Sequence, residues 1–261
     1  MSSHGTPHRA PTRRRRLGRA AAYAIPVAVV LFVVGFLVRS RWDPLQSLDD
    51  AVIDAATAFT RPNEGLRSFL VFWQELTQPI RLYLVGTLLC LWVWLAKGMR
   101  TRAAWAFGTM MLAWMIGLGA KYVFQRARPV VEDPVSEAPG YSFPSGHALN
   151  AAAWSVIVVV LLWPLLRSRA ARAVAVGLAA LVVVVTAVDR VLLGVHFPSD
   201  ATVGVVTGIG LALASYAGYT GWNPPHPTEA DDPDVDESDD AAGSTGATVV
   251  GSDRRRHTTH P

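Results

Sequence analysis

The chain alternates between long apolar stretches and short polar connections. Uncharged runs occupy residues 20–38, 82–96, 103–120, 148–166, 173–188 and 201–222. Each is near the length that a helix needs to cross about 30 Å of hydrocarbon at about 1.5 Å per residue, and Pro79 and Ile80 extend the second run backwards. The pattern predicts an all-α fold, an integral membrane bundle of six helices.

The first run also resembles part of an export signal. A basic block at residues 13–16 and 19 precedes it, as in a signal peptide or a twin-arginine signal. The run is longer than a usual signal-peptide core, and no cleavage motif of small residues follows it. We therefore favour an uncleaved first membrane span.

The segment between the first two spans has a different pattern. Two apolar stripes recur there at helical spacing: Leu45, Leu48, Val52 and Ala55, then Phe69, Phe72, Trp73 and Leu76. Asp49, Asp50 and Asp54 lie on other faces of the first of these helices. Such stripes predict amphipathic helices in the membrane interface. Ordinary packing of the stripes against the bundle is the alternative.

Composition and charge fit a membrane protein and indicate its orientation. Of 261 residues, 51% are hydrophobic and 17% are charged, and the formal net charge is +4. The first 228 residues hold 21 bases against 11 acids. The basic connections at 97–102 and 167–172 fall on the same side as the basic N-terminus, which the positive-inside rule assigns to the cytoplasm. The extracytoplasmic side then receives residues 39–79, 123–146 and 191–199.

These features divide the chain into three parts. Residues 1–19 form a basic cytoplasmic tail, 20–222 the six-span membrane domain and 223–261 an acidic tail. That last tail is rich in Pro, Asp, Gly, Ser and Thr and cannot bury a core, so we expect it to be disordered and cytoplasmic. The single cysteine, Cys90, excludes an intrachain disulfide and a Cys-based metal site. The sequence contains no nucleic-acid motif.

Polar side chains gather at the ends of the third to sixth spans. Alternating topology puts these ends in one leaflet, where ionisable groups need partners or a function. Of the seven histidines, five lie in the tails and the other two lie here. The candidate site residues are Lys121, Arg128, Ser145, Gly146, His147, Arg190, His196 and Asp200.

Five of these eight residues suit the binding of a phosphate group. Lys121, Arg128 and Arg190 would make a strong anion site, since guanidinium groups fit phosphate oxygens in bidentate fashion. Ser145 and Gly146 stand at a helix start, which adds backbone N–H donors and the positive end of the helix dipole.

The other residues supply groups for catalysis. His196 and Asp200 lie one helical turn apart, so the carboxylate can hold the imidazole in one tautomer for nucleophilic attack. His147 can then protonate a leaving group. Together with the anion site, these groups predict phosphoryl transfer through a covalent intermediate. The sequence shows no carboxylate cluster suited to Mg²⁺ or Ca²⁺, so chemistry without metal or cofactor is the simpler interpretation.

Each signal taken alone has a plainer explanation. Lys121 fits a side chain that snorkels at a helix end. Asp189 and Arg190 fit a structural ion pair, and His196 with Asp200 fits a satisfied local hydrogen bond. The convergence of four helix ends on one leaflet favours a functional site.

Three motifs in order carry a family resemblance. Residues 121–129 fit K-x6-R-P and 144–147 fit P-S-G-H, whereas 189–200 fit S-R-x5-H-x3-D except for Asp189 at the first position. Over about residues 45–222 the chain resembles the type 2 phosphatidic acid phosphatase superfamily, which also includes soluble vanadium-dependent haloperoxidases. The membrane spans argue against a haloperoxidase.

The resemblance implies a role for each site residue. His196 would become phosphorylated, Asp200 would orient it and His147 would protonate the leaving group, with no metal required. The phosphate would be held by Lys121, Arg128, Ser145, Gly146 and Arg190.

Asp189 departs from the family pattern, which has serine at this position. A carboxylate aimed at the phosphate would repel it. We therefore expect Asp189 to face away from the site, or to pair with a nearby base such as Arg126 or Arg128. A member with impaired catalysis is the alternative.

Two functions of different classes follow. The first is a metal-independent lipid phosphatase at the extracytoplasmic surface of the bilayer, acting on a polyprenyl (undecaprenyl) diphosphate in the recycling of a cell-wall lipid, or alternatively on phosphatidate or phosphatidylglycerophosphate. The second is a non-enzymatic binder of anionic lipids or a transporter component. A binder needs the cations but gives no reason for two histidines and an aspartate.

Overall fold

The computed structural model describes residues 13–131, 136 and 138–220. Within them every regular element is helical. The helices are α1 (Arg13–Arg39), α2 (Asp43–Thr60), α3 (Glu64–Leu76), α4 (Pro79–Lys97), α5 (Arg100–Phe124), α6 (Gly146–Leu162), η1 (a 3₁₀ turn, Trp163–Leu165), α7 (Arg169–Leu192) and α8 (Pro198–Tyr219). The predicted acidic tail at 223–261 lies outside the described residues.

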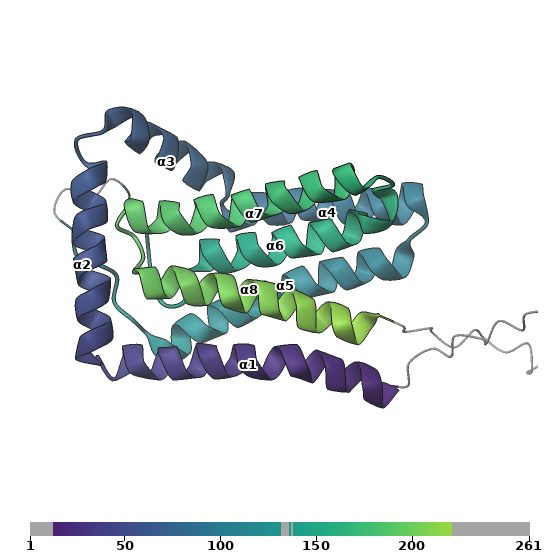
Figure 1. The fold of residues 1–261 in the computed structure, drawn as a ribbon, viewed down its shortest axis with the longest axis horizontal. Helices are drawn as coiled ribbons and strands as arrows, with labels where there is room; N and C mark the ends of the chain where they lie inside the picture. Colours follow the sequence, from purple (N-terminus) through teal and green to yellow (C-terminus); the bar gives the residue numbers. More distant parts are fainter. Residues whose placement is uncertain (1–12, 132–135, 137, 221–261) are drawn as a thin grey trace, which may run out of the picture. The chain divides into compact units, whose positions relative to one another are not determined.

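Six of the helices are long and apolar enough to cross a membrane: α1, α4, α5, α6 with η1, α7 and α8. Figure 1 shows these six running alongside one another, with α2 across one end. The predicted all-α membrane bundle is therefore confirmed. The helix of the first span begins at Arg13, because the basic block predicted as part of a tail continues the helix beyond the apolar run.

The start of α6 is packed tightly against α8. Gly204 and Gly208 of α8, four residues apart, form a small-xxx-small pair of the kind that lets membrane helices approach closely. A Cβ added to Gly208 would lie 2.3 Å from the carbonyl oxygen of Leu149, and one on Gly204 would lie 2.8 Å from that of Ser145. Four neighbouring alanines of α6 are fully or almost fully buried, namely Ala148, Ala151, Ala152 and Ala153. This contact fixes two of the helix starts that carry the predicted site.

The two helices between the first spans turn most of their apolar stripes outward. Leu48 is 60% exposed on α2 and Phe72 is 62% exposed on α3. The face of α2 that packs on α7 and α8 instead carries Asp49, Ile53 and Thr57. Outward apolar stripes at one end of a membrane bundle fit interfacial helices. The alternative, packing against the bundle, describes two members of the stripes. Leu45 lies against the buried cluster that contains Leu31 and Phe124, and the indole N–H of Trp73 donates to the hydroxyl of Thr186 on α7 at 3.1 Å.

Replacing Gly208 with alanine is expected to lower the free energy of unfolding by about 1–3 kcal/mol, because the added methyl group overpacks a tight backbone contact. Thermal unfolding of the detergent-purified protein measures the effect. Gly177→Ala on α7 is the matched control, since a Cβ there meets no atom within 4 Å and alanine favours the helix. Equal unfolding temperatures for the two variants would contradict the tight packing of α6 on α8.

Candidate functional site

The eight predicted site residues gather at one end of the bundle, where α5 and α7 end and α6 and α8 begin. The cavity there has a volume of about 240 Å³ and is bordered by Trp114 and Leu118 on its apolar side. Six of the eight residues line it: Lys121, Arg128, Gly146, His147, Arg190 and His196. We call this space the catalytic cavity. The other two, Asp200 and Ser145, stand behind its wall.

The ring of His196 is buried, and each of its nitrogens has defined surroundings. Nη1 of Arg128 lies 3.2 Å from Nε2, and because a guanidinium can only donate, Nε2 carries a lone pair. Nδ1 lies 3.6 Å from Oδ2 of Asp200 and 3.3 Å from the hydroxyl of Ser142. This geometry favours the tautomer with its proton on Nδ1 and leaves Nε2 as the nitrogen able to act as a nucleophile.

The charge state of His196 suits that role. Burial lowers the pKa of His196 to about 4, an effect that Asp200 partly offsets and that the positive charges of Arg128 and Lys121 reinforce. Burial also lowers the pKa of Arg128, although a guanidinium keeps its charge. At neutral pH the site therefore holds a neutral imidazole beside a cation.

The carboxylate of Asp200 is fixed by several donors. Oδ2 accepts hydrogen bonds from the backbone N–H of Phe197, at 3.0 Å, and from the hydroxyl of Ser142. Oδ1 lies 2.7 Å from Nη1 of Arg126. Because Asp200 is also in the first turn of α8, the helix dipole stabilises its negative charge. These contacts hold the carboxylate toward His196.

Arg126 links Asp200 to the interfacial helix α2. Its Nη2 lies 2.7 Å from Oδ2 of Asp49, and Oδ1 of Asp49 accepts from the backbone N–H of Ser199 at 3.1 Å. The guanidinium also lies over the ring of Phe197, 3.9 Å from its centroid. All three charged side chains are almost fully buried. They form one ionic network, Asp49–Arg126–Asp200.

Asp49, Arg126 and Ser142 were not among the predicted site residues. Arg126 occupies an unassigned position inside the first motif, and its charge at membrane depth is itself a signal for a partner. Asp49 shares the spacing of the buried residues Ile53 and Thr57, so a second, buried stripe on α2 was present in the sequence. Ser142 gave no signal, because it lies in an irregular connection.

Lys121 and Arg128 present positive charges to the catalytic cavity. Nζ of Lys121 donates to the carbonyl of Tyr141 at 2.6 Å. Arg128 donates to the carbonyls of Gly140 and Val195, at 3.1 and 2.7 Å. Backbone carbonyls orient these side chains without neutralising them, so both charges remain available to an anion.

Arg190, by contrast, is paired with its neighbour. Its Nε lies 2.8 Å from Oδ2 of Asp189, and its Nη2 contacts the same oxygen. Asp189 does pair with a base, but the expected partners Arg126 and Arg128 were wrong. Arg126 is held by two other carboxylates, and Arg190 is adjacent in the chain, so the structural ion pair weighed as an alternative is formed.

Gly146 and Ser145 occupy different places at the start of α6. Gly146 lines the catalytic cavity. Ser145 is the N-cap, and its Oγ accepts from the backbone N–H of Ala148 at 3.4 Å. The N–H of Ser145 donates to the carbonyl of Asp200 at 3.0 Å. Ser145 thereby joins the starts of α6 and α8, and its hydroxyl oxygen caps the N-terminus of α6.

His147 lies on the cavity wall with one nitrogen unpaired. Its Nε2 is buried and has no hydrogen-bond partner among the residues that the structure describes. A buried nitrogen of this kind is available to a ligand. Across residues 13–131, 136 and 138–220, no group of three or more His, Cys, Asp or Glu side chains is placed to hold a metal ion.

Known proteins match this chain over its membrane-spanning part. The profile of the PAP2 superfamily matches residues 102–224. Phosphatidylglycerophosphatase B of Bacillus subtilis (strain 168) is 29% identical over 192 residues, which cover 70% of this chain and 89% of that protein. Phosphatidylglycerophosphatase B of Escherichia coli (strain K12) is 41% identical over 80 residues, 30% of this chain. The chain spans only 28% of the length of that second relative.

A solved structure shares the fold. The transmembrane PAP2 type phosphatidylglycerolphosphate phosphatase from Bacillus subtilis superposes with a TM-score of 0.59 at 23% identity, covering 72% of this chain and 93% of that one. At this identity the match concerns the fold alone. The family profile and the three motifs around one cavity make this chain similar to the PAP2 superfamily over residues 102–224, and the fold that it shares is that of a membrane-spanning protein.

Proposed function

We propose that this protein is a membrane lipid phosphatase that hydrolyses a phosphate ester through a phosphohistidine. The observation that supports this most directly is the setting of His196, with Arg128 at Nε2 and Asp200 behind Nδ1. Such a setting activates a nucleophile. A protein that only binds anionic lipids would need the cations and not this pair.

In the first step, Nε2 of His196 attacks the phosphorus atom of the bound headgroup. The N–P bond forms as the P–O bond to the lipid breaks, and the leaving oxygen takes a proton from His147, which enters the step in its protonated form. Lys121 and Arg128 stabilise the charge on the phosphoryl oxygens.

In the second step, water attacks the phosphorus atom and gives a proton to His147. The N–P bond breaks, which releases inorganic phosphate and restores neutral His196. Between the two steps the imidazole is positively charged. Asp49 and Asp200 around the single cation Arg126 leave one negative charge in excess, and this excess balances the imidazolium.

The charges around the catalytic cavity favour a phosphate monoester. Because Asp189 neutralises Arg190, Lys121 and Arg128 supply two unmatched positive charges, and a monoester carries about −1.5 to −2 near neutral pH. The relatives named phosphatidylglycerophosphatase B support the same class. We therefore place phosphatidylglycerophosphate and phosphatidate ahead of the polyprenyl diphosphate that the sequence analysis put first.

The catalytic end of the bundle is proposed to face the extracytoplasmic side, with both termini in the cytoplasm. The basic residues of the connections, such as Lys97, Arg100 and Arg169, lie at the helix ends remote from the catalytic cavity. The positive-inside rule assigns that end to the cytoplasm. The catalytic cavity would then meet lipids of the outer leaflet.

Phosphate release by the purified protein in EDTA tests the function. We expect release from phosphatidylglycerophosphate and phosphatidate to survive chelation, and His196→Ala to lower it by about 10⁴-fold or more, because no N–P bond can form. The variant should keep its stabilisation by inorganic phosphate, which reports an intact anion site. Turnover by His196→Ala at the wild-type rate would exclude the phosphohistidine. Faster release from undecaprenyl diphosphate would overturn the preference for monoesters.

Asp49→Asn tests the positioning role of the ionic network. Asp49 contacts no atom of the catalytic cavity and acts through Arg126 and Asp200, so kcat should fall about 10-fold, equivalent to about 1.4 kcal/mol, while KM changes little. Steady-state kinetics on the same lipid measure both constants. Asp54→Asn is the matched control, because Asp54 is an exposed acid on the same helix. An equal loss in both variants, or a change confined to KM, would contradict this role.

Asp189→Ser tests whether the neighbouring carboxylate withholds Arg190 from the substrate. Freed Arg190 can bind the phosphate, and KM is expected to fall about 5-fold, equivalent to about 1 kcal/mol. Without phosphate the variant should unfold at a lower temperature, because a buried cation has lost its partner, and added phosphate should restore much of the loss. Asp189→Asn removes the charge and keeps the shape of the side chain, so it should show the same lower KM as Asp189→Ser. A higher KM in both variants would show that the carboxylate supports binding.

A further inference from the structure

A second cavity lies at the same end of the bundle, beside the catalytic one. It has a volume of about 470 Å³ and is formed where α1 passes into α2 and where α5 ends. The two cavities share Arg128 and no other lining residue. No histidine lines the second one. It therefore has no nucleophile of the catalytic type and is suited to binding alone.

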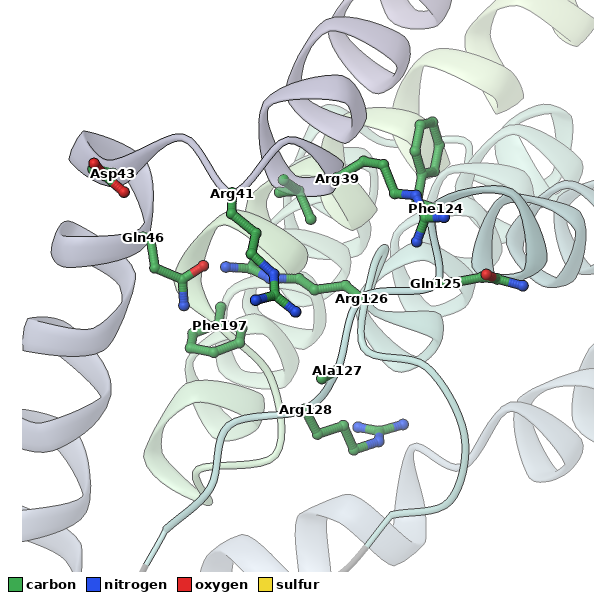
Figure 2. A pocket seen from close by; sticks show the side chains of 11 residues that line it. Arg39, Arg41, Asp43, Gln46, Phe124, Gln125, Arg126, Ala127, Arg128 and Phe197 are labelled. Atoms are coloured by element: carbon green, nitrogen blue, oxygen red, sulfur yellow. The ribbon is translucent and has the colours of Figure 1, made fainter.

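Arginines dominate this second cavity. Figure 2 shows Arg41 extending from the end of α1 toward Arg126, whereas Arg39 extends toward Phe124. Arg39 and Arg41 are exposed, and in the part of the chain that the structure describes neither side chain has a hydrogen-bond or ion-pair partner. Asp43 is the one carboxylate among the lining residues.

The other two arginines of the second cavity, Arg126 and Arg128, already interact with groups outside it. Arg126 is held between Asp49 and Asp200, and Arg128 faces the catalytic cavity as well. The positive charge that is free to bind a ligand in the second cavity thus comes from Arg39 and Arg41. Both guanidinium groups line one cavity, and guanidinium groups donate strongly to phosphate oxygens.

Apolar grooves continue from the cationic cavity along α1 and α5. The first, of about 520 Å³, shares Arg39 and Phe124 with the cavity and is otherwise lined by side chains such as Phe36. The second, of about 400 Å³, shares Phe32, Val123 and Phe124 with the first and reaches Leu211 on α8. A cationic pocket at the bundle end thus leads into an apolar channel at membrane depth. This order of polar and apolar parts matches a phospholipid.

We propose that the second cavity and these grooves bind one anionic phosphodiester lipid that is not hydrolysed. Arg39 and Arg41 hold its phosphate, and the grooves along α1 and α5 take one of its chains. A zwitterionic lipid carries an additional cation, which the arginines would repel. The site therefore selects lipids with a net negative headgroup, such as phosphatidylglycerol.

The bound lipid would contact two residues that hold Asp200 in place beside the catalytic cavity. Arg126 and Phe197 form part of the wall of the second cavity, and both donate hydrogen bonds to Asp200. A ligand in the cavity keeps water away from this network and holds the turn after α5. Occupancy is thus expected to raise the unfolding temperature.

Native mass spectrometry of the full chain tests the proposal, with His196→Ala as background so that binding is read without turnover. Titration with phosphatidylglycerol should show one lipid bound at least about 10-fold more tightly than phosphatidylcholine, equivalent to about 1.4 kcal/mol. The double variant Arg39→Gln/Arg41→Gln should lose this preference and the accompanying thermal stabilisation. Dihexanoyl phosphatidylglycerol and glycerol phosphate should bind more weakly, because they fill the grooves partly or not at all.

Arg167→Gln/Arg169→Gln is the matched control. It removes two exposed arginines with the same spacing, next to the start of α7 at the opposite end of the bundle, and should keep the preference for phosphatidylglycerol. Equal loss in both double variants would mean that the lipid senses only the net charge of the surface, which overturns the site. Retained preference in Arg39→Gln/Arg41→Gln, or glycerol phosphate binding as tightly as the lipid, would overturn it too. None of these results depends on phosphatase activity.

Discussion

A carboxylate that is removed from water needs a compensating charge, and the Asp200 carboxylate finds it in Arg126, 2.7 Å away. The guanidinium of Arg126 is buried as well and shares its charge with a second carboxylate, that of Asp49 on the interfacial helix α2. Removing one partner from such a network leaves an uncompensated buried charge, at a cost of about 3–5 kcal/mol. Segments distant in the chain, namely α2, the turn after α5 and the start of α8, are thereby tied at one point. The orientation of His196 depends on that point.

The sequence predicts the framework well because its signals are local. Uncharged runs of sufficient length indicate the spans, and the three motifs place His147, His196 and Asp200 at helix starts that share one end of the bundle. The ionic network is not local in this sense. Asp49 and Arg126 are 77 residues apart, and one acid among the four on α2 cannot be distinguished by its spacing to the motifs. Pairing across the fold decides which acid is buried.

For Asp189 the sequence identifies the residue but not its partner. The motif comparison identifies it as unusual, and Coulomb repulsion correctly predicts that it needs a cation. The choice of cation depends on which guanidinium groups are already occupied. Arg126 is held by two carboxylates and Arg128 by backbone carbonyls and His196, so Arg190 remains, and it is adjacent in the chain. A residue predicted to bind phosphate is thus neutralised by its neighbour, and the cationic strength of the catalytic cavity falls from three charges to two.

The two cavities at this end of the bundle differ in the cations that are free to bind an anion. Arg126 cannot leave its two carboxylates without exposing buried charges, so it contributes shape to the second cavity and little free charge. An anion bound there is balanced by Arg39 and Arg41, whereas an anion in the catalytic cavity is balanced by Lys121 and Arg128. Because the counter-charges are distinct, a lipid phosphate can occupy the second cavity while a substrate occupies the catalytic cavity, with Arg128 as the one residue that lines both. Under the two proposals, an anionic lipid bound in the second cavity therefore does not compete with a phosphorylated lipid in the catalytic cavity.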